Sequence, residues 1–267
     1  MTVPQQQGKP GTAVAKQERE EMLAELAQKY TPEIEALAPE GMTAAMFIAS
    51  LRLYLSTNPA VAECTKLSIA QGVLRAAQTG LTLGVSCDLL PFNKVAQFSP
   101  RYGGIIELAL AAGVNAINAD VVRAGDLFEF EKGTKPYLRH TRGFKRDGLI
   151  THAYAVAALR FGQCVFEVAT REEVDRVREQ FSRSWKRDVD AFGHQRREPL
   201  ELDLIPWYAK KTMVRKLAPF LPKNPRLAAA LLFAEAKGPE EGDTAGIQTP
   251  EPEHTPDGEI LGTVEEI

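Results

Sequence analysis

The segment PWYAKKTMVRKLA, residues 206–218, places cations and one indole ring at helical spacing. Trp207, Lys211 and Arg215 recur at i, i+4 and i+8, so they form one column on a helix. The segment holds no acid, whereas solubilising faces usually mix both signs of charge. We therefore expect the helix to bind phosphate groups, and the alternative is that its cations pair with acids of a neighbouring segment. The candidate DNA contacts on it are Trp207, Lys210, Lys211, Thr212, Arg215 and Lys216.

A second candidate site lies in RYGGIIELALAAG, residues 101–113, where a cation and an aromatic residue precede an apolar helical segment. A helix start offers unpaired N–H groups and a partial positive charge, which suit a polyanion. Two interpretations stay open. Either the glycines close a tight turn and Tyr102 packs on the core, or Gly103 and Gly104 let a DNA backbone approach while Arg101 adds charge and Tyr102 a flat surface.

A third candidate is the basic stretch EKGTKPYLRHTRGFKRDG, residues 131–148. Cations in two adjacent strands and their turn are suited to follow a phosphate backbone while aromatic rings touch bases. A solvated guard of a sheet edge explains the same charges equally well. The cations are Lys132, Lys135, Arg139, Arg142, Lys145 and Arg146, around Tyr137 and Phe144; Lys94, in a predicted hairpin turn, and Arg123 complete the candidate DNA contacts.

Signatures of catalysis are weak in this sequence. It has no GxxxxGK[ST] loop, which argues against ATP hydrolysis of the usual kind, and no GxSxG motif. The four histidines show no metal-ligand spacing; His152 is expected to be structural and the others exposed. Glu129 and Glu131 fit the solvent face of a strand better than a nuclease metal site. We expect no catalytic residue, no bound metal and no cofactor, although Mg²⁺ can influence DNA pairing.

Charge is distributed unevenly along the 267 residues, whose net charge is −3. Residues 238–267 contain nine acids and no Lys or Arg, residues 1–37 carry −2, and residues 38–237 carry +8. A basic body with an acidic tail is common in proteins that meet nucleic acid. The three cysteines are widely spaced, and neither a signal peptide nor a membrane span is visible. These features predict a soluble cytoplasmic protein.

The apolar pattern predicts an α+β fold, a mostly antiparallel sheet flanked by helices. Helices are expected from residue 16 to a stop at Pro32, from Thr43 to residue 57, and over residues 66–78 before Gly80. A hairpin over 87–100, a helix before Gly113 and several strands over 115–168 follow. Further helices are predicted after Thr170, Pro206 and Asn224, with a long mobile loop over 182–205. We expect disorder at 1–15, a DNA-binding and annealing domain over 16–237, and a disordered acidic tail over 238–267.

The order of several motifs resembles the RecT family of phage single-strand DNA annealing proteins. The motifs are AAQTGLTLG, LLPF, RYGGIIELALAAG, VVRAGDLFEFEKG and PWYAKKTMVRKLAPFLP, spread over about residues 65–225. Each motif alone is weak, but five in the right order are fairly specific. Two positions depart from the family pattern: Gly103 stands where relatives usually have Lys or Arg, and Pro219 interrupts a stretch that is polar or basic in relatives.

The resemblance implies ATP-independent binding of single-stranded DNA and annealing of complementary strands in phage-type homologous recombination. It also implies a helical homo-oligomer on DNA, an annealed duplex as product, and partnership with a phage exonuclease and a host single-strand binding protein, with no membrane involved. The main alternative is a metal-dependent DNA-processing enzyme such as a nuclease. A third possibility is a structural phage component whose basic face binds protein.

Overall fold

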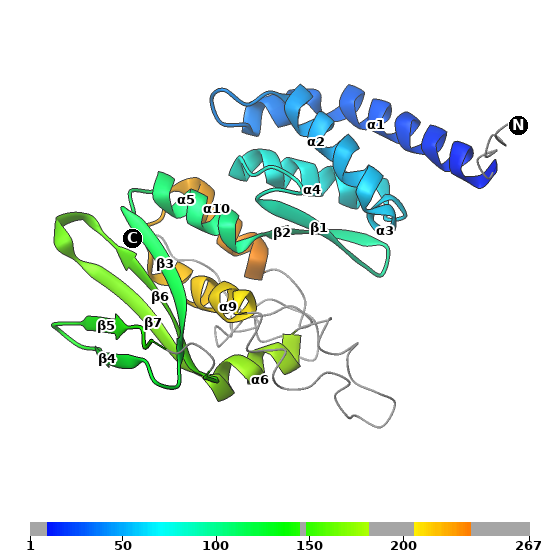
Figure 1. Cartoon of the computed structure of the whole chain (residues 1–267). Helices are drawn as coiled ribbons and strands as arrows, with labels where there is room; N and C mark the ends of the chain where they lie inside the picture. The colour runs from blue at the N-terminus through cyan, green and yellow to red at the C-terminus, as the bar shows by residue number, and fades with distance from the viewer. Residues whose placement is uncertain (1–9, 145–147, 182–205, 236–267) are drawn as a thin grey trace, which may run out of the picture.

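The computed structural model describes residues 10–144, 148–181 and 206–235 (Figure 1). The helices are α1 (Pro10–Leu37), α2 (Ala44–Thr57), α3 (Pro59–Ala62), α4 (Lys66–Thr79), α5 (Tyr102–Ala111), α6 (Arg171–Phe181), α9 (Trp207–Leu217) and α10 (Pro225–Glu235), with 3-10 turns η1 (Arg160–Gly162) and η2 (Ala218–Phe220). The strands are β1 (Cys87–Phe92), β2 (Val95–Pro100), β3 (Ala116–Arg123), β4 (Leu127–Glu131), β5 (Tyr137–Thr141), β6 (Ile150–Ala158) and β7 (Cys164–Thr170).

Helices combined with antiparallel strands confirm the predicted α+β class, although the described strands form three small sheets instead of one. The predicted mobile loop at 182–205 and acidic tail at 238–267 lie outside the described residues. Within the described part of the chain, no helix has both the length and the apolar character needed to cross a membrane.

The first helix is longer than the sequence predicts, because residues 10–15 are helical and Pro32 lies inside it. The prediction that Pro32 ends this helix is therefore wrong. Proline removes one backbone donor, but contacts beyond it hold the chain in place. Ile34 is buried in the core, and the Glu35 carboxylate accepts a hydrogen bond from the N–H of Ala44 at 2.7 Å. Tertiary contacts here outweigh a local helix-breaking preference.

The predicted ends of α4 are confirmed. Thr65 caps its first turn, with the hydroxyl accepting from the N–H of Ser68 at 3.4 Å, and Gly80 follows its last turn in the left-handed conformation, with φ 69°. This helix contacts α1, α2 and the β1–β2 hairpin, and together they form the helical layer drawn in the upper part of Figure 1.

The central sheet has the order β3-β6-β7 and is antiparallel throughout. Side chains alternate between its faces, and Ala153, Ala155 and Ala157 of β6 are completely buried on one of them. Helix α9 contacts all three strands of this sheet. The small alanine side chains allow the helix backbone to approach the sheet closely, which fixes α9 on the scaffold.

A separate hairpin, β4–β5, lies against the opposite face of the sheet. The ring of Phe128 stacks on Tyr154 with 5.7 Å between centroids, and Phe130 meets the ring of Phe166 edge-on at 6.4 Å. Among the described strands, β4 and β5 pair only with each other. Aromatic contacts, and not a shared hydrogen-bond ladder, therefore position this hairpin (Figure 1).

Candidate nucleic-acid interface

Helix α9 buries one side and presents cations and an indole ring on the other. Met213 and Leu217 lie in the core, whereas Trp207 is 51% exposed. The Lys211 ammonium lies 5.9 Å from the centroid of the Trp207 ring, one turn earlier, at cation–π distance. The predicted exposed position of Thr212 is wrong, because Thr212 is buried among the core residues of the helix. Its hydroxyl is therefore not presented to a ligand in this structure.

A buried carboxylate joins α9 to the end of the β4–β5 hairpin. Asp120 of β3 is only 6% exposed, and its Oδ1 accepts from the Lys210 ammonium at 2.9 Å. Its Oδ2 accepts from the guanidinium of Arg142, which follows β5. One acid thus pairs with both Lys210 and Arg142, two predicted DNA contacts that are 68 positions apart in the sequence.

This ion cluster borders an open pocket of about 450 Å³, lined also by Val121, Arg123 and Pro206. Arg123 donates from Nη1 to the carbonyl oxygen of Gly148 at 2.8 Å. Three cations and one carboxylate around the pocket leave a positive balance. The pocket therefore suits an anionic group such as a backbone phosphate.

Asp120 is ionised at neutral pH. Burial by itself raises the pKa of this carboxyl, but the hydrogen bonds from Lys210 and Arg142 outweigh burial and lower the pKa to about 2. Its negative charge is consequently always present between the two cations. A phosphate that reaches them competes with this carboxylate.

The start of α5 lies next to the last turn of α9. Arg101 forms a two-pronged ion pair with Asp88, with Nε–Oδ2 and Nη2–Oδ1 distances of 2.7 Å. Arg215 donates to the carbonyl oxygen of Pro100 at 3.1 Å. The structure thus brings Arg101 and Arg215 to either side of Pro100, and Tyr102 beside them is partly exposed.

Asp88 also faces Tyr54. The Tyr54 hydroxyl lies 3.3 Å from Asp88 and donates to the carbonyl oxygen of Leu89 at 3.1 Å. Burial, together with the negative charge of Asp88, raises the pKa of Tyr54 to about 12. The Arg101–Asp88 pair is therefore anchored to α2, and Arg101 is held in one orientation.

The two glycines after Tyr102 have different surroundings. A Cβ on Gly104 would lie 2.2 Å from the carbonyl oxygen of Ser86, whereas a Cβ on Gly103 would meet nothing within 4 Å. Gly104 is buried, so its missing side chain makes room for the protein's own backbone. The interpretation that Gly104 admits a DNA backbone is therefore corrected, and Gly103 is the glycine with open space beside it.

The predicted cations of the β4–β5 hairpin differ in their exposure and in their ion pairs. Arg139 is exposed and lies opposite Glu129 in the strand register. Lys132 is paired with Glu167 of β7 at 3.0 Å, so it ties the hairpin to the sheet. Lys145 and Arg146 lie outside the described residues.

The other end of the hairpin is fixed by a buried polar chain that the sequence did not predict. His140 Nε2 lies 3.0 Å from Oδ2 of Asp126, and its Nδ1 lies 3.2 Å from the hydroxyl of Tyr154. His140 is 5% exposed, so its predicted exposure is wrong. Burial raises the pKa of Asp126, but hydrogen bonds from the N–H groups of Arg123 and Gly143 and from His140 lower it to about 2.

Lys94 is not part of this arrangement. It is exposed in the β1–β2 turn, in the left-handed conformation with φ 62°. The turn is at the opposite end of the hairpin from Pro100, five residues of strand away, a separation of about 17 Å. The structure therefore leaves Lys94 apart from Arg101 and α9.

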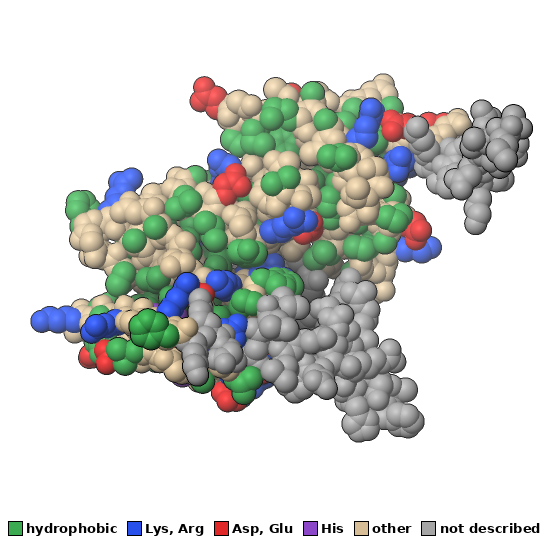
Figure 2. Space-filling view, in the orientation of Figure 1, with side chains coloured by type: hydrophobic (Ala, Val, Ile, Leu, Met, Phe, Trp, Pro, Cys, Tyr) green, Lys and Arg blue, Asp and Glu red, His purple; other side chains and the backbone are tan. Residues whose placement is uncertain are grey.

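The remaining predicted residues are exposed on α9 and on the hairpin. Figure 2 shows several Lys and Arg side chains in the lower left part of the view, separated from one another by hydrophobic and other side chains. Lys216 is exposed on α9, and Tyr137 and Phe144 are exposed on and after β5. Among the described residues, no three His, Cys, Asp or Glu side chains are grouped as metal ligands would be. The surface carries charge and aromatic rings, which bind a nucleic acid backbone and its bases.

The sequence did not predict that Asp120 and Asp126 position the other residues of the site. An acid at position 120 within the apolar run AINADVV was the available signal, because a charged residue in a buried strand requires a partner. The partners themselves are 22 and 90 positions away, a distance over which one sequence gives no pairing information.

Comparisons with known proteins identify the family of this chain. The model of the RecT family matches residues 45–225. Protein RecT of Escherichia coli (strain K12) is 31% identical over 221 residues, which cover 76% of this chain and 76% of that protein. The matched region includes β3, the β4–β5 hairpin and α9.

Proposed function

This chain belongs to the RecT family, and on that premise we propose that it binds single-stranded DNA and anneals complementary strands in homologous recombination of the phage type. One observation carries the proposal: α9, the end of β3 and the residue after β5 place Lys210, Arg123 and Arg142 around one open pocket, on the helix that also carries the Trp207–Lys211 pair. Segments distant in sequence thus bring three cations to one pocket.

In this proposal the protein binds the sugar-phosphate backbone and leaves the edges of the bases accessible. Phosphate contacts position a strand without reading its sequence. The exposed Trp207 ring offers a face on which a base can stack, and every base has such a face. A second strand is then selected by Watson–Crick pairing, so the protein needs no sequence code of its own.

Annealing in this scheme requires no ATP and no covalent chemistry. Two strands repel each other through their phosphates, and neutralisation by cations lowers this repulsion. A strand already held extended has lost much of its conformational freedom, so pairing costs less entropy. We propose that copies of the chain assemble into a helical oligomer that holds a strand over many nucleotides and then retains the annealed duplex. A phage exonuclease would supply the single strands, and a host single-strand binding protein would compete for them.

The direct test mixes two complementary oligonucleotides carrying a fluorescence donor and acceptor, with the full-length protein and without ATP. We expect faster pairing than in protein-free solution, with and without Mg²⁺. Lys94→Ala is the matched control, since this exposed lysine lies apart from the surface. Strand cleavage in Mg²⁺ would instead indicate a nuclease, and failure to retain any oligonucleotide at low salt would refute DNA binding.

A further inference from the structure

The turn between β6 and β7 carries an exposed aromatic residue in a strained conformation. Phe161 has φ 61° and ψ 29°, and its side chain is 98% exposed. A bulky residue in the left-handed region is uncommon, and a conformation of this kind costs about 1 kcal/mol or more. The described residues of one copy leave this ring in solvent, and both features point to a contact with another molecule.

A DNA base is a poor match for this ring. The turn follows Ala158, which pairs with Ala116 at one end of β3, whereas the cationic pocket lies around Asp120, opposite Tyr154. Four residues of strand separate the two positions, about 13 Å before the turn begins. Beside Phe161, the turn contributes one cation, Arg160. The position and the low charge favour a protein partner.

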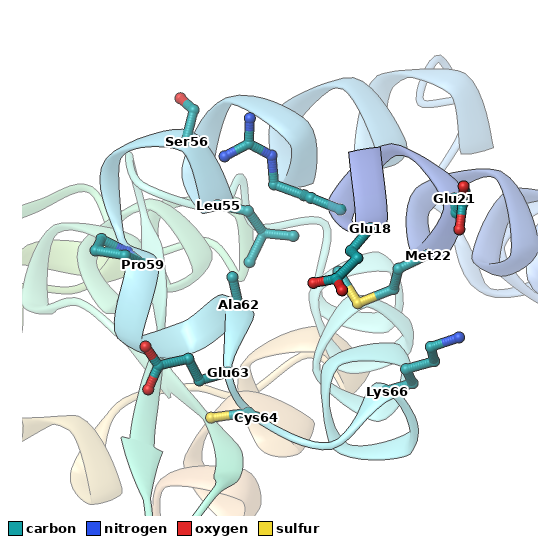
Figure 3. A pocket seen from close by; sticks show the side chains of 11 residues that line it. Glu18, Glu21, Met22, Leu55, Ser56, Pro59, Ala62, Glu63, Cys64 and Lys66 are labelled. Atoms are coloured by element: carbon teal, nitrogen blue, oxygen red, sulfur yellow. The ribbon is translucent and has the colours of Figure 1, made fainter. Parts of the chain in front are cut away.

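A pocket that fits this ring lies between α1, α2 and α3. It has a volume of about 530 Å³, enough for a phenyl ring and part of a neighbouring side chain. Figure 3 shows Glu18 and Met22 of α1 pointing towards Leu55 of α2 and Ala62 of α3. The floor is apolar, because Met22 and Leu55 are buried core residues, and Pro59 and Cys64 extend it.

The rim of the pocket is complementary to Arg160. Glu18, Glu21 and Glu63 line it together with one further cation, Arg19, and within the described part of the chain no Lys or Arg forms an ion pair with Glu18 or Glu63. Lys66 on the same rim is already paired with Glu25 at 2.6 Å. An incoming arginine therefore meets carboxylates whose charge is not neutralised by an ion pair.

The turn and the pocket lie at opposite ends of the molecule. In Figure 1 the turn joining β6 and β7 is at the left edge, and α1 and α3 are on the right. We infer that Phe161 of one copy inserts into the α1–α3 pocket of the next copy, with Arg160 facing Glu63 or Glu18. A contact between two different surfaces leaves one of each unused at the chain ends, so it propagates into an open assembly. The contact itself does not depend on the proposed function. Only the role that we give to the assembly, which is to hold a long DNA strand, rests on it.

Disulfide trapping tests the contact on the full-length protein without DNA. Phe161→Cys and Glu63→Cys are combined in a Cys64→Ser and Cys164→Ser background, because Cys64 lines the pocket and Cys164 is close to the turn in sequence. Under mild oxidation we expect a ladder of covalent multimers on a non-reducing gel. Phe161→Cys alone in the same background is the control. Dimers from this single variant, with no ladder from the pair, would mean that two turns meet each other, and would overturn the inference.

Phe161→Ala provides a second measurement by analytical ultracentrifugation. We expect self-association to weaken about tenfold or more, as for a buried aromatic anchor, while Phe144→Ala, at an equally exposed ring, leaves it unchanged. Unchanged assembly of Phe161→Ala would overturn the inference. A mobility shift with an oligonucleotide short enough for one copy separates the two proposals, because unassembled Phe161→Ala is still expected to bind it. Absence of binding by the wild type would refute the proposed function and leave the contact standing.

Discussion

Replacing Asp120 by Asn tests the central ion cluster. The substitution preserves shape and removes the one negative charge between Lys210 and Arg142. A pKa of about 2 in the folded protein, against an ordinary value of 3.8, corresponds to roughly 2 kcal/mol of stabilisation by the ionised carboxylate. Breaking a fully buried pair costs more, but Lys210 and Arg142 are 35% and 56% exposed and can turn to water. We therefore expect a loss of about 2 kcal/mol, or a Tm lower by roughly 4–8 °C.

The sign of the pH dependence follows from the lowered pKa. The stabilisation by Asp120 is fully present above the pKa of the unfolded carboxyl, near 4, and is lost as pH falls through the folded value of about 2. In denaturation experiments between about pH 4 and pH 2, this contribution to the loss of stability is expected in the wild type and absent in Asp120→Asn. Glu129→Gln, at an exposed acid of the hairpin, is the control and should leave the acid response of the wild type unchanged.

DNA binding by the same variant should change in the opposite direction. Without Asp120, a phosphate no longer competes for the two cations, so the folded fraction should bind single strands more tightly. The slope of log affinity against log salt should steepen by about 0.7 for one additional phosphate neutralised. A slope that becomes shallower would show that Asp120 orients the cations and does not compete with DNA. An unchanged Tm together with an unchanged slope would refute the reasoning about the cluster.

Three other changes give distinct outcomes. Lys211→Ala combined with Arg215→Ala should weaken single-strand binding for all sequences, reduce the salt slope by at most roughly two units, and slow annealing. The loss of the hydrogen bond from Arg215 to a main-chain carbonyl should lower the free energy of unfolding by about 1 kcal/mol. Wild-type affinity in a folded double mutant would exclude α9 as the DNA site. Truncation after Lys237 removes nine acids and should strengthen binding at low salt, and unchanged affinity would leave the tail without an autoinhibitory role. Gly104→Ala places a Cβ 2.2 Å from a main-chain oxygen and should cost about 1–3 kcal/mol in chemical denaturation, whereas a loss of similar size in Gly103→Ala would contradict the packing explanation.

Local signals in the sequence were sufficient where the structure depends on local chemistry. The capping box of α6 is present, with the N–H of Glu173 donating to the Thr170 hydroxyl at 3.3 Å and the N–H of Thr170 donating to the Glu173 carboxylate at 3.0 Å. Gly80 ends α4 as predicted. Each of these features involves residues within four positions of one another, so spacing and residue type define it.

Features that depend on tertiary contacts were predicted poorly. Thr212 was placed on the exposed side of α9, although the sheet and neighbouring helices bury it. His140 was expected to be exposed, but Asp126 and Tyr154 lie within hydrogen-bond distance of its two ring nitrogens. The ion cluster at Asp120 joins residues of a strand, a loop and a helix that are far apart in the sequence. A single sequence gives no information on which of these residues contact one another.

The β4–β5 hairpin contacts the central sheet through side chains and, among the described strands, shares no ladder with it. A strand that is added to a ladder has its length and register dictated by its neighbour, whereas this hairpin is free of that constraint. Insertions at its tip or exchanges on its outer face leave the pairing of β3, β6 and β7 untouched, provided that the Phe128 and His140 contacts remain. Evolution can therefore vary the reach and charge of this arm independently of the scaffold, and an engineer can graft a different arm onto the same three strands.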